Sequence, residues 1–218
     1  MGVVTVGAGD AHGSRPGEAA AAPAAAARIG PNAVLRLAEA LRALAGEAAA
    51  ERVFERAGQL RHLRVPPTAM VDEREVAALY AALRAEPDGA LVHGAAREAG
   101  TRTALYLLAH RIPRPVQVLL RRLPPALASR LLLLGIGGHA WTFAGSARFG
   151  CVPIRRGVRL TLTGNPLCRG VVADEPVCGF YAATFERLYQ ELVSRRAKVR
   201  EVACEAAGSA ACVFEARW

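Results

Sequence analysis

Hydrophobic positions in the first half of the chain recur with the spacing of amphipathic helices. Val34, Leu37 and Leu41 fall on one helical face, and similar spacing continues for about a hundred residues. Asp72 is a predicted N-cap, with Glu75 three residues later completing a capping box. Together with the proline positions, the pattern predicts helices at residues 31–46, 47–62, 72–84, 88–110 and 113–134, the last interrupted by Pro124-Pro125.

The period changes after about residue 135. Residues 139–150 and 157–164 are rich in aromatic and β-branched side chains, which predicts two strands. Residues 176–193 return to helical spacing, and residues 198–205 and 210–216 alternate as strands do. We therefore expect an α+β fold in which N-terminal helices precede a β-β-α-β-β unit with an antiparallel sheet.

The chain divides into a tail and one domain. Residues 1–28 are rich in Gly, Ala and Pro, which predicts a disordered tail. Residues 29–218 are enough for a single domain with a substantial core, helical over 29–135 and carrying the sheet over 136–218. The early segment VGAGDAHG is followed by a Pro/Ala tract rather than a βαβ unit, so we do not expect a dinucleotide loop.

Composition narrows the class of protein. The 218 residues carry a net charge of +9, and almost all of the basic residues are arginines. Pairs of arginines are scattered along the chain rather than gathered in one nucleic-acid-binding block. No apolar run reaches the ~18–20 residues of a membrane-spanning helix, so we expect at most peripheral membrane contact. We also expect a cytoplasmic location, because the chain starts without the features of a signal peptide.

Three cysteines and one glutamate near the C-terminus are the strongest chemical signal. Cys204 and Cys212 flank a turn around Gly208, so a symmetric hairpin places them opposite each other, and Cys178 precedes them on a helix. With Glu201, they form a plausible tetrahedral donor set for Zn²⁺. A shared metal requires a bulge or a strand end between Glu201 and Cys204, which are three residues apart. Buried core thiols and a disulfide are the alternatives.

Several stretches resemble the 4-vinyl reductase domain family. They are HAWTFAGS (139–146), GNPLCRG (164–170), PVCGFYAATFERLYQELV (176–193) and EVACEAAGSAACVFEA (201–216). The chain from about Gly30 looks most like the bacteriochlorophyll 4-vinyl reductase proteins of photosynthetic bacteria. Related ligand-sensing domains of phenol-responsive activators hold zinc with Cys, Glu, Cys and Cys at the intervals that separate Cys178, Glu201, Cys204 and Cys212. Cys151 and Cys168 fall outside this pattern, and we expect them to be unligated.

The resemblance also implies a function. The family fold is similar to that of vesicle-tethering-complex subunits and often dimerises, so a homodimer is expected. The family name implies reduction of the vinyl group of a divinyl chlorophyllide or protochlorophyllide precursor, but such a reaction needs an electron donor for which the sequence has no recognisable motif. We therefore favour a carrier or assembly factor that binds a magnesium tetrapyrrole, with magnesium chelatase and the magnesium-protoporphyrin methyltransferase as implied partners. A small-molecule-sensing regulatory module is a further alternative.

A tetrapyrrole needs an apolar slot and an axial ligand. His139, Trp141 and Phe143 alternate within the predicted strand 139–150, so they would share one face and line such a slot. The alternative is ordinary core packing around a hydrogen-bonded histidine.

Overall fold

The computed structural model describes residues 27–218, apart from the side chain of Trp141. The expected tail, residues 1–28, lies outside the described residues except for Ala27 and Arg28. Arg28 belongs to a short strand, β1 (Arg28–Ile29), which pairs antiparallel with β2 (Val71–Asp72) and fastens the start of the domain.

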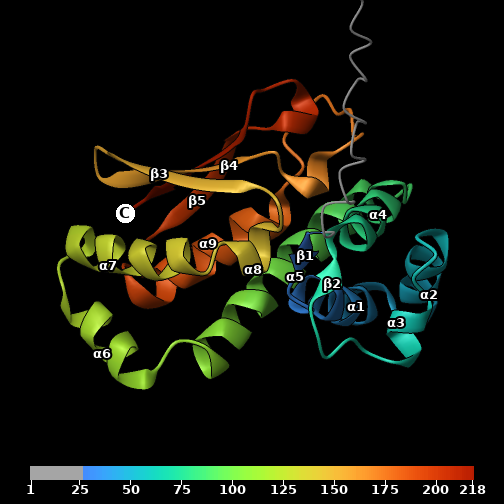
Figure 1. Cartoon of the computed structure of the whole chain (residues 1–218), viewed down its shortest axis with the longest axis horizontal. Helices are drawn as coiled ribbons and strands as arrows, with labels where there is room; N and C mark the ends of the chain where they lie inside the picture. Colours follow the sequence, from blue (N-terminus) through green and yellow to red (C-terminus); the bar gives the residue numbers. More distant parts are fainter. Residues whose placement is uncertain (1–26) are drawn as a thin grey trace, which may run out of the picture.

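The N-terminal half is helical, as the periodicity predicts, and occupies one end of the molecule (Figure 1). Its elements are α1 (Asn32–Ala45), α2 (Glu47–Arg56), α3 (Arg61–Arg64), α4 (Glu73–Arg84), α5 (Gly89–His110), α6 (Arg114–Arg122) and α7 (Pro125–Gly138). The predicted helix 47–62 is wrong in extent, because α2 ends at Arg56 and the chain turns through Gly58, whose φ is +67°, before α3.

The predicted capping of α4 is half right. The Asp72 carboxylate accepts a hydrogen bond from the Arg74 backbone N–H at 2.8 Å, which confirms the N-cap. Glu75 does not complete a capping box. Its carboxylate pairs instead with His62 at 2.9 Å and Arg61 at 2.7 Å, so it ties α4 to α3.

The C-terminal half contains the predicted β-β-α-β-β unit. Its elements are β3 (Arg148–Ile154), β4 (Gly157–Thr163), α9 (Gly179–Leu192), β5 (Lys198–Ala203) and β6 (Cys212–Arg217). The four strands are antiparallel in the order β3-β4-β6-β5, so the α+β fold class is confirmed and β5 is an edge strand. Helix α9 lies between this sheet and α5 (Figure 1), and its buried aromatic residues form the centre of the core.

The predicted strand at 139–150 is wrong over most of its length. Helix α7 continues to Gly138, one further turn forms α8 (Trp141–Ala144), and β3 begins only at Arg148. Tertiary contacts outweigh the strand propensity here. The Thr142 carbonyl accepts a hydrogen bond from the Gly30 N–H at 2.7 Å, and Phe143 packs edge-on to Phe185 of α9.

Candidate metal centre

The β5–β6 hairpin brings two cysteines together. Ala203 pairs with Val213 across the ladder, and the next residues in register are Cys204 and Cys212, whose Sγ atoms are 3.9 Å apart. The register shifts between Glu201 and Ala203, so the β-bulge that a shared site required is present. Gly208, with φ of +83°, supplies the left-handed turn between the strands.

Helix α9 and the loop before it supply two more cysteines. Cys178 is the N-cap residue of α9, and its Sγ lies 3.9 Å from that of Cys204 and 3.7 Å from that of Cys212. Cys168 ends a 3-10 turn, η1 (Pro166–Cys168), and its Sγ lies 3.3 Å from that of Cys178, 3.5 Å from that of Cys212 and 3.7 Å from that of Cys204. Cys168, which the sequence analysis expected to be unligated, therefore lies within the group, whereas Cys151 is exposed and is not part of it.

The four sulfurs have the dimensions of a tetrahedral metal site. A tetrahedron with Zn–S bonds of about 2.3 Å has S···S edges of about 3.8 Å, and the six Sγ–Sγ distances here run from 3.3 to 3.9 Å. A disulfide needs a separation of about 2.05 Å, and all four cysteines are free and buried. The group therefore fits a tetrahedral metal ion with soft ligands better than a disulfide.

The thiols perturb one another strongly. Contact with Cys168 and the other two sulfurs, together with burial, raises the pKa of the Cys178 thiol. Hydrogen bonds from Cys168, Cys178 and Cys212 lower the pKa of the Cys204 thiol. In a metal-free group the sulfurs must therefore share protons, because four thiolates this close repel one another. A divalent cation is the partner that allows all four to be ionised.

Asn165 fixes one side of the cysteine group. Its fully buried side-chain amide donates toward Cys178 Sγ at 3.2 Å and Cys212 Sγ at 3.3 Å, while its Oδ1 accepts from the Leu167 N–H at 3.0 Å. The Glu205 carboxylate accepts from the Gly164 N–H at 2.6 Å and the Asn165 N–H at 2.8 Å. Amide donors of this kind stabilise thiolate charge and orient ligands. The contacts of Asn165 and Glu205 also hold the η1 loop against the hairpin.

Glu201 lies beside the four sulfurs. Its Oε2 accepts a hydrogen bond from the Cys178 N–H at 2.7 Å, and its Oε1 is buried with no hydrogen-bond partner among the described residues. Burial and then the negative charge of Cys204 raise the pKa of Glu201 to about 9. The donor atoms that lie within 4.8 Å of one another are the four sulfurs, so the geometry groups Cys168, rather than Glu201, with the other three cysteines.

Arg84 lies near the cysteine group and lines the same pocket as Glu201. Its guanidinium donates to the Leu167 carbonyl at 2.7 Å, which connects the end of α4 to η1. Burial lowers the pKa of Arg84, and the negative charges of Cys168 and Cys178 act in the opposite direction. Four thiolates with one divalent cation would carry a net charge of −2, and the half-buried guanidinium would balance part of this charge.

The structure separates the three residues predicted for a tetrapyrrole slot. They do not share a strand face, because His139 is the C-cap residue of α7 while Trp141 and Phe143 belong to α8. Phe143 packs among the core aromatic residues Phe149, Tyr181 and Phe185. His139 is exposed, and its Nδ1 lies 2.9 Å from the Gly135 carbonyl oxygen. Since that oxygen only accepts, Nδ1 carries the proton and Nε2 has the free lone pair.

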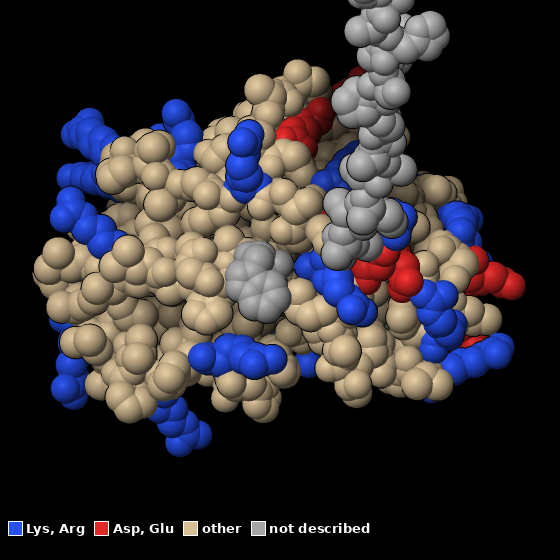
Figure 2. Space-filling model, viewed as in Figure 1, with Lys and Arg blue, Asp and Glu red and all other residues tan. Residues whose placement is uncertain are grey.

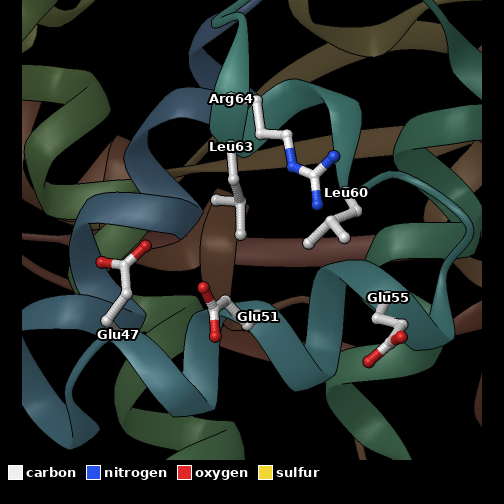
Figure 3. Close-up of a pocket in the computed structure, with 6 residues that line it drawn as sticks. All are labelled: Glu47, Glu51, Glu55, Leu60, Leu63 and Arg64. Carbon is white, nitrogen blue, oxygen red and sulfur yellow. The ribbon is translucent and has the colours of Figure 1, made fainter.

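Two pockets open elsewhere on the surface. One, of about 320 Å³, lies between α2 and α3, where Glu47, Glu51 and Glu55 line one side and Leu63 and Arg64 the other (Figure 3). The second, of about 380 Å³, lies next to the cysteine group and is lined by residues of α4, α5, α9, β5 and the loop before α9, including Arg84, His93, Arg97, Val177 and Glu201. Neither pocket includes His139 or Phe143 in its lining.

Comparison with known proteins finds a matching family model and two similar proteins. The model of the V4R domain family matches residues 158–217, the segment that holds the cysteine hairpin. The chain is 43% identical over 194 residues to the bacteriochlorophyll synthase 23 kDa chain of Cereibacter sphaeroides, covering 88% of this chain and 92% of that protein. It is 38% identical over 189 residues to the protein of the same name from Rhodobacter capsulatus, covering 86% and 85%.

The fold is also similar to a solved structure. An H-NOX structure from a study of heme distortion superposes with a TM-score of 0.54 at 15% identity, covering 87% of this chain and 95% of that one. At this identity the likeness concerns the fold alone. The sequence matches are much stronger, and the chain belongs to the V4R-domain family of bacteriochlorophyll synthase 23 kDa chains.

Proposed function

We propose that the chain is a carrier or assembly factor of bacteriochlorophyll biosynthesis that binds a magnesium tetrapyrrole and contains a structural zinc ion. The names of its two relatives support the pathway. The observation that carries the zinc assignment is the buried group of four sulfurs at tetrahedral separations. Early enzymes of the same pathway, such as magnesium chelatase and the magnesium-protoporphyrin methyltransferase, are the proposed partners.

The cysteine group favours a structural ion over a catalytic one. Cys168, Cys178, Cys204 and Cys212 would occupy all four positions of a tetrahedral zinc ion, and a catalytic zinc keeps one position for water or substrate. Zinc bound there would stabilise the fold as a cross-link, because it would join η1, the start of α9 and both strands of the hairpin. Glu201 holds the Cys178 N–H, and Asn165 donates to the sulfurs.

Ligand substitutions test which residues bind zinc. We expect Cys204→Ser and Cys168→Ser to lose zinc and to melt well below the wild type, since structural zinc contributes directly to folding. Cys151→Ser is the matched control, because Cys151 is exposed and outside the group. Elemental analysis and thermal melts give the readout. If Cys168→Ser keeps one zinc per chain while Glu201→Gln loses it, the fourth ligand is Glu201.

His139 supports the tetrapyrrole proposal. Its Nδ1–H donates to a main-chain carbonyl, which orients the ring and leaves the Nε2 lone pair exposed. A neutral imidazole held in this way is suited to act as an axial ligand of a porphyrin magnesium.

Titration with magnesium protoporphyrin tests this binding. We expect the visible absorption band to shift and saturate, and His139→Ala to weaken the affinity by at least about tenfold, a typical cost of losing one strong contact. His110→Ala is the control, because His110 is also exposed but its ring packs at a tilt against that of Tyr106. The absence of a spectral change with both the wild type and His110→Ala would contradict the proposal. Reduction of a divinyl substrate by the pure protein with reduced nicotinamide would replace the carrier with the vinyl reductase.

A further inference from the structure

The charge of the chain is concentrated in its middle. Residues 99–173 contain eleven arginines and no aspartate, glutamate or lysine. This segment alone carries +11, so the rest of the chain, at a total of +9, sums to −2. Within the described residues, four of these arginines pair with acidic residues from outside the segment, namely Arg102, Arg121, Arg159 and Arg169. The other seven are exposed and form no ion pair with a described acidic residue.

Exposed hydrophobic side chains gather in the same segment. Of the twelve large hydrophobic residues exposed in the described part of the chain, eight lie between residues 105 and 152. On α7, Leu127, Leu131 and Leu134 are 47%, 45% and 73% exposed and recur at i, i+4 and i+7, so they form one outward stripe. The opposite face of α7 is buried, where Ser129 Oγ lies 3.0 Å from the Tyr189 hydroxyl of α9.

Both features lie at one end of the molecule. Helices α6 and α7 form the end away from α1–α4, beside the β3–β4 hairpin (Figure 1). Figure 2 shows this end as an uncharged surface edged by basic side chains, with the acidic side chains of that view elsewhere. Arg114 and Arg122 of α6 and Arg130 of α7 lie beside the exposed leucines in the sequence. We call the outward faces of residues 114–134 the α6–α7 surface.

We propose that the α6–α7 surface docks on a bilayer of anionic phospholipids. Leucines of the outward stripe would enter the acyl boundary, while the long arginine side chains reach the phosphate groups. A second copy of the chain is a poor occupant, because two surfaces of the same positive charge would repel each other. No helix among the described residues has the length and apolar character to cross a bilayer.

Vesicle flotation tests this docking with the full chain. We expect binding to phosphatidylcholine vesicles that contain about one-third phosphatidylglycerol, and little binding to phosphatidylcholine alone. The binding should weaken as salt rises, because screening shortens the reach of the arginine charges. Equal binding to both kinds of vesicle, or binding to neither, would overturn the proposal.

Two pairs of substitutions separate the charged and apolar contributions. We expect Arg122→Gln with Arg130→Gln to weaken binding by about 25-fold, since each basic residue near an anionic surface contributes about fivefold. Leu131→Gln with Leu134→Gln should weaken it by at least about tenfold, because one leucine leaving the acyl boundary costs that much. All four side chains are exposed, so thermal melts should stay at the wild-type value.

Matched controls come from the opposite end of the molecule. Arg64 is exposed without an ion pair to a described acidic residue, and Val65 is 75% exposed, so Arg64→Gln and Val65→Gln repeat the same chemistry elsewhere. Both should change vesicle binding by less than about twofold, well below one surface contact. If sedimentation velocity instead finds a dimer that Leu131→Gln with Leu134→Gln dissociates, the surface is a subunit interface. Since no porphyrin or zinc measurement enters the test, its failure leaves the proposed function untouched.

Discussion

Gly100 lies where α5 and α9 approach each other closely, and its replacement tests the packing that supports the cysteine group. A Cβ atom added at Gly100 would lie 2.2 Å from the Phe180 carbonyl oxygen of α9. Real contacts of this kind begin near 3.0 Å, so Gly100→Ala requires the helices to move apart by about 1 Å. Helix α9 starts directly after Cys178, so this movement would also displace one corner of the cysteine group.

The expected cost follows from two opposing terms. Overpacking in a close-packed core costs about 1–3 kcal/mol, and a backbone contact at 2.2 Å falls at the upper end. Alanine gains at most about 1 kcal/mol of helix propensity over glycine. We therefore expect Gly100→Ala to destabilise the fold by about 2 kcal/mol, which lowers the melting temperature by about 4–8 °C for a chain of this size.

A control for helix propensity lies on the same helix. At Gly94 an added Cβ would meet only the Leu44 Cδ1 atom, at the ordinary distance of 3.6 Å. Gly94→Ala should therefore raise the melting temperature by about 1–4 °C, from propensity alone. Thermal melts of both variants at equal zinc occupancy give the comparison. A melting temperature for Gly100→Ala at or above that of the wild type would refute the close-packing explanation.

Three further predictions concern the contacts around the site. Asn165→Asp keeps the acceptor for the Leu167 N–H but removes the amide donor to the sulfurs, so zinc affinity should fall by about 10–100-fold in a competition titration with a chromophoric chelator. Chelation of zinc at neutral pH should lower the melting temperature, and acid should do the same because protons compete for the thiolates; a melt unmoved by chelator would refute a structural ion. Burial opposes ionisation of Glu73, but hydrogen bonds from Ser146 and Arg169 outweigh this effect and hold the pKa of Glu73 below its usual value. The contribution of the Glu73 carboxylate to the stability of the fold is therefore present above a pH of about 4.5 and is lost as the pH falls through the lowered pKa. Glu73→Gln should remove that part of the acid dependence and cost about 1–3 kcal/mol at neutral pH, measured by denaturant unfolding from pH 3 to 7.

The sequence predicted the parts of the site that local pattern determines. Cys204 and Cys212 flank a turn with alternating residues on both sides, so their approach follows from hairpin geometry. Cys178 precedes a helix whose apolar face must cover the sheet, so it was placed near them as well. The need for a bulge between Glu201 and Cys204 followed from their offset of three positions, because an odd offset sends two side chains of a regular strand to opposite faces.

Cys168 was missed because a long-range contact positions it. Its loop follows Gly164, whose φ is +75°, and is held by Glu205, about forty residues further along the chain. No periodicity in GNPLCRG reports that contact. An available signal was the residue type itself, since Asn165 and Cys168 lie in the turn after β4, and β4 pairs with β6 of the cysteine hairpin.

Residues 139–147 were misassigned because their local sequence pattern favours a strand, whereas their tertiary contacts favour a helical turn. Aromatic and β-branched residues there favour a strand on average, but Phe143 gains more from reaching the aromatic side chains of α9. A single helical turn positions it for that contact, and Gly145, with φ of +60°, then redirects the chain toward β3.

The order in which the four sulfurs occur along the chain determines when the site forms during synthesis. Cys168 and Cys178 are synthesised before α9, whereas Cys204 and Cys212 follow it, so all four meet only once β6 pairs beside β4. A nascent chain that stops within α9 thus presents two unpartnered thiols and an uncovered apolar helix. A metal ion shared by all four sulfurs could therefore be bound only after β6 has been synthesised and has paired with β4.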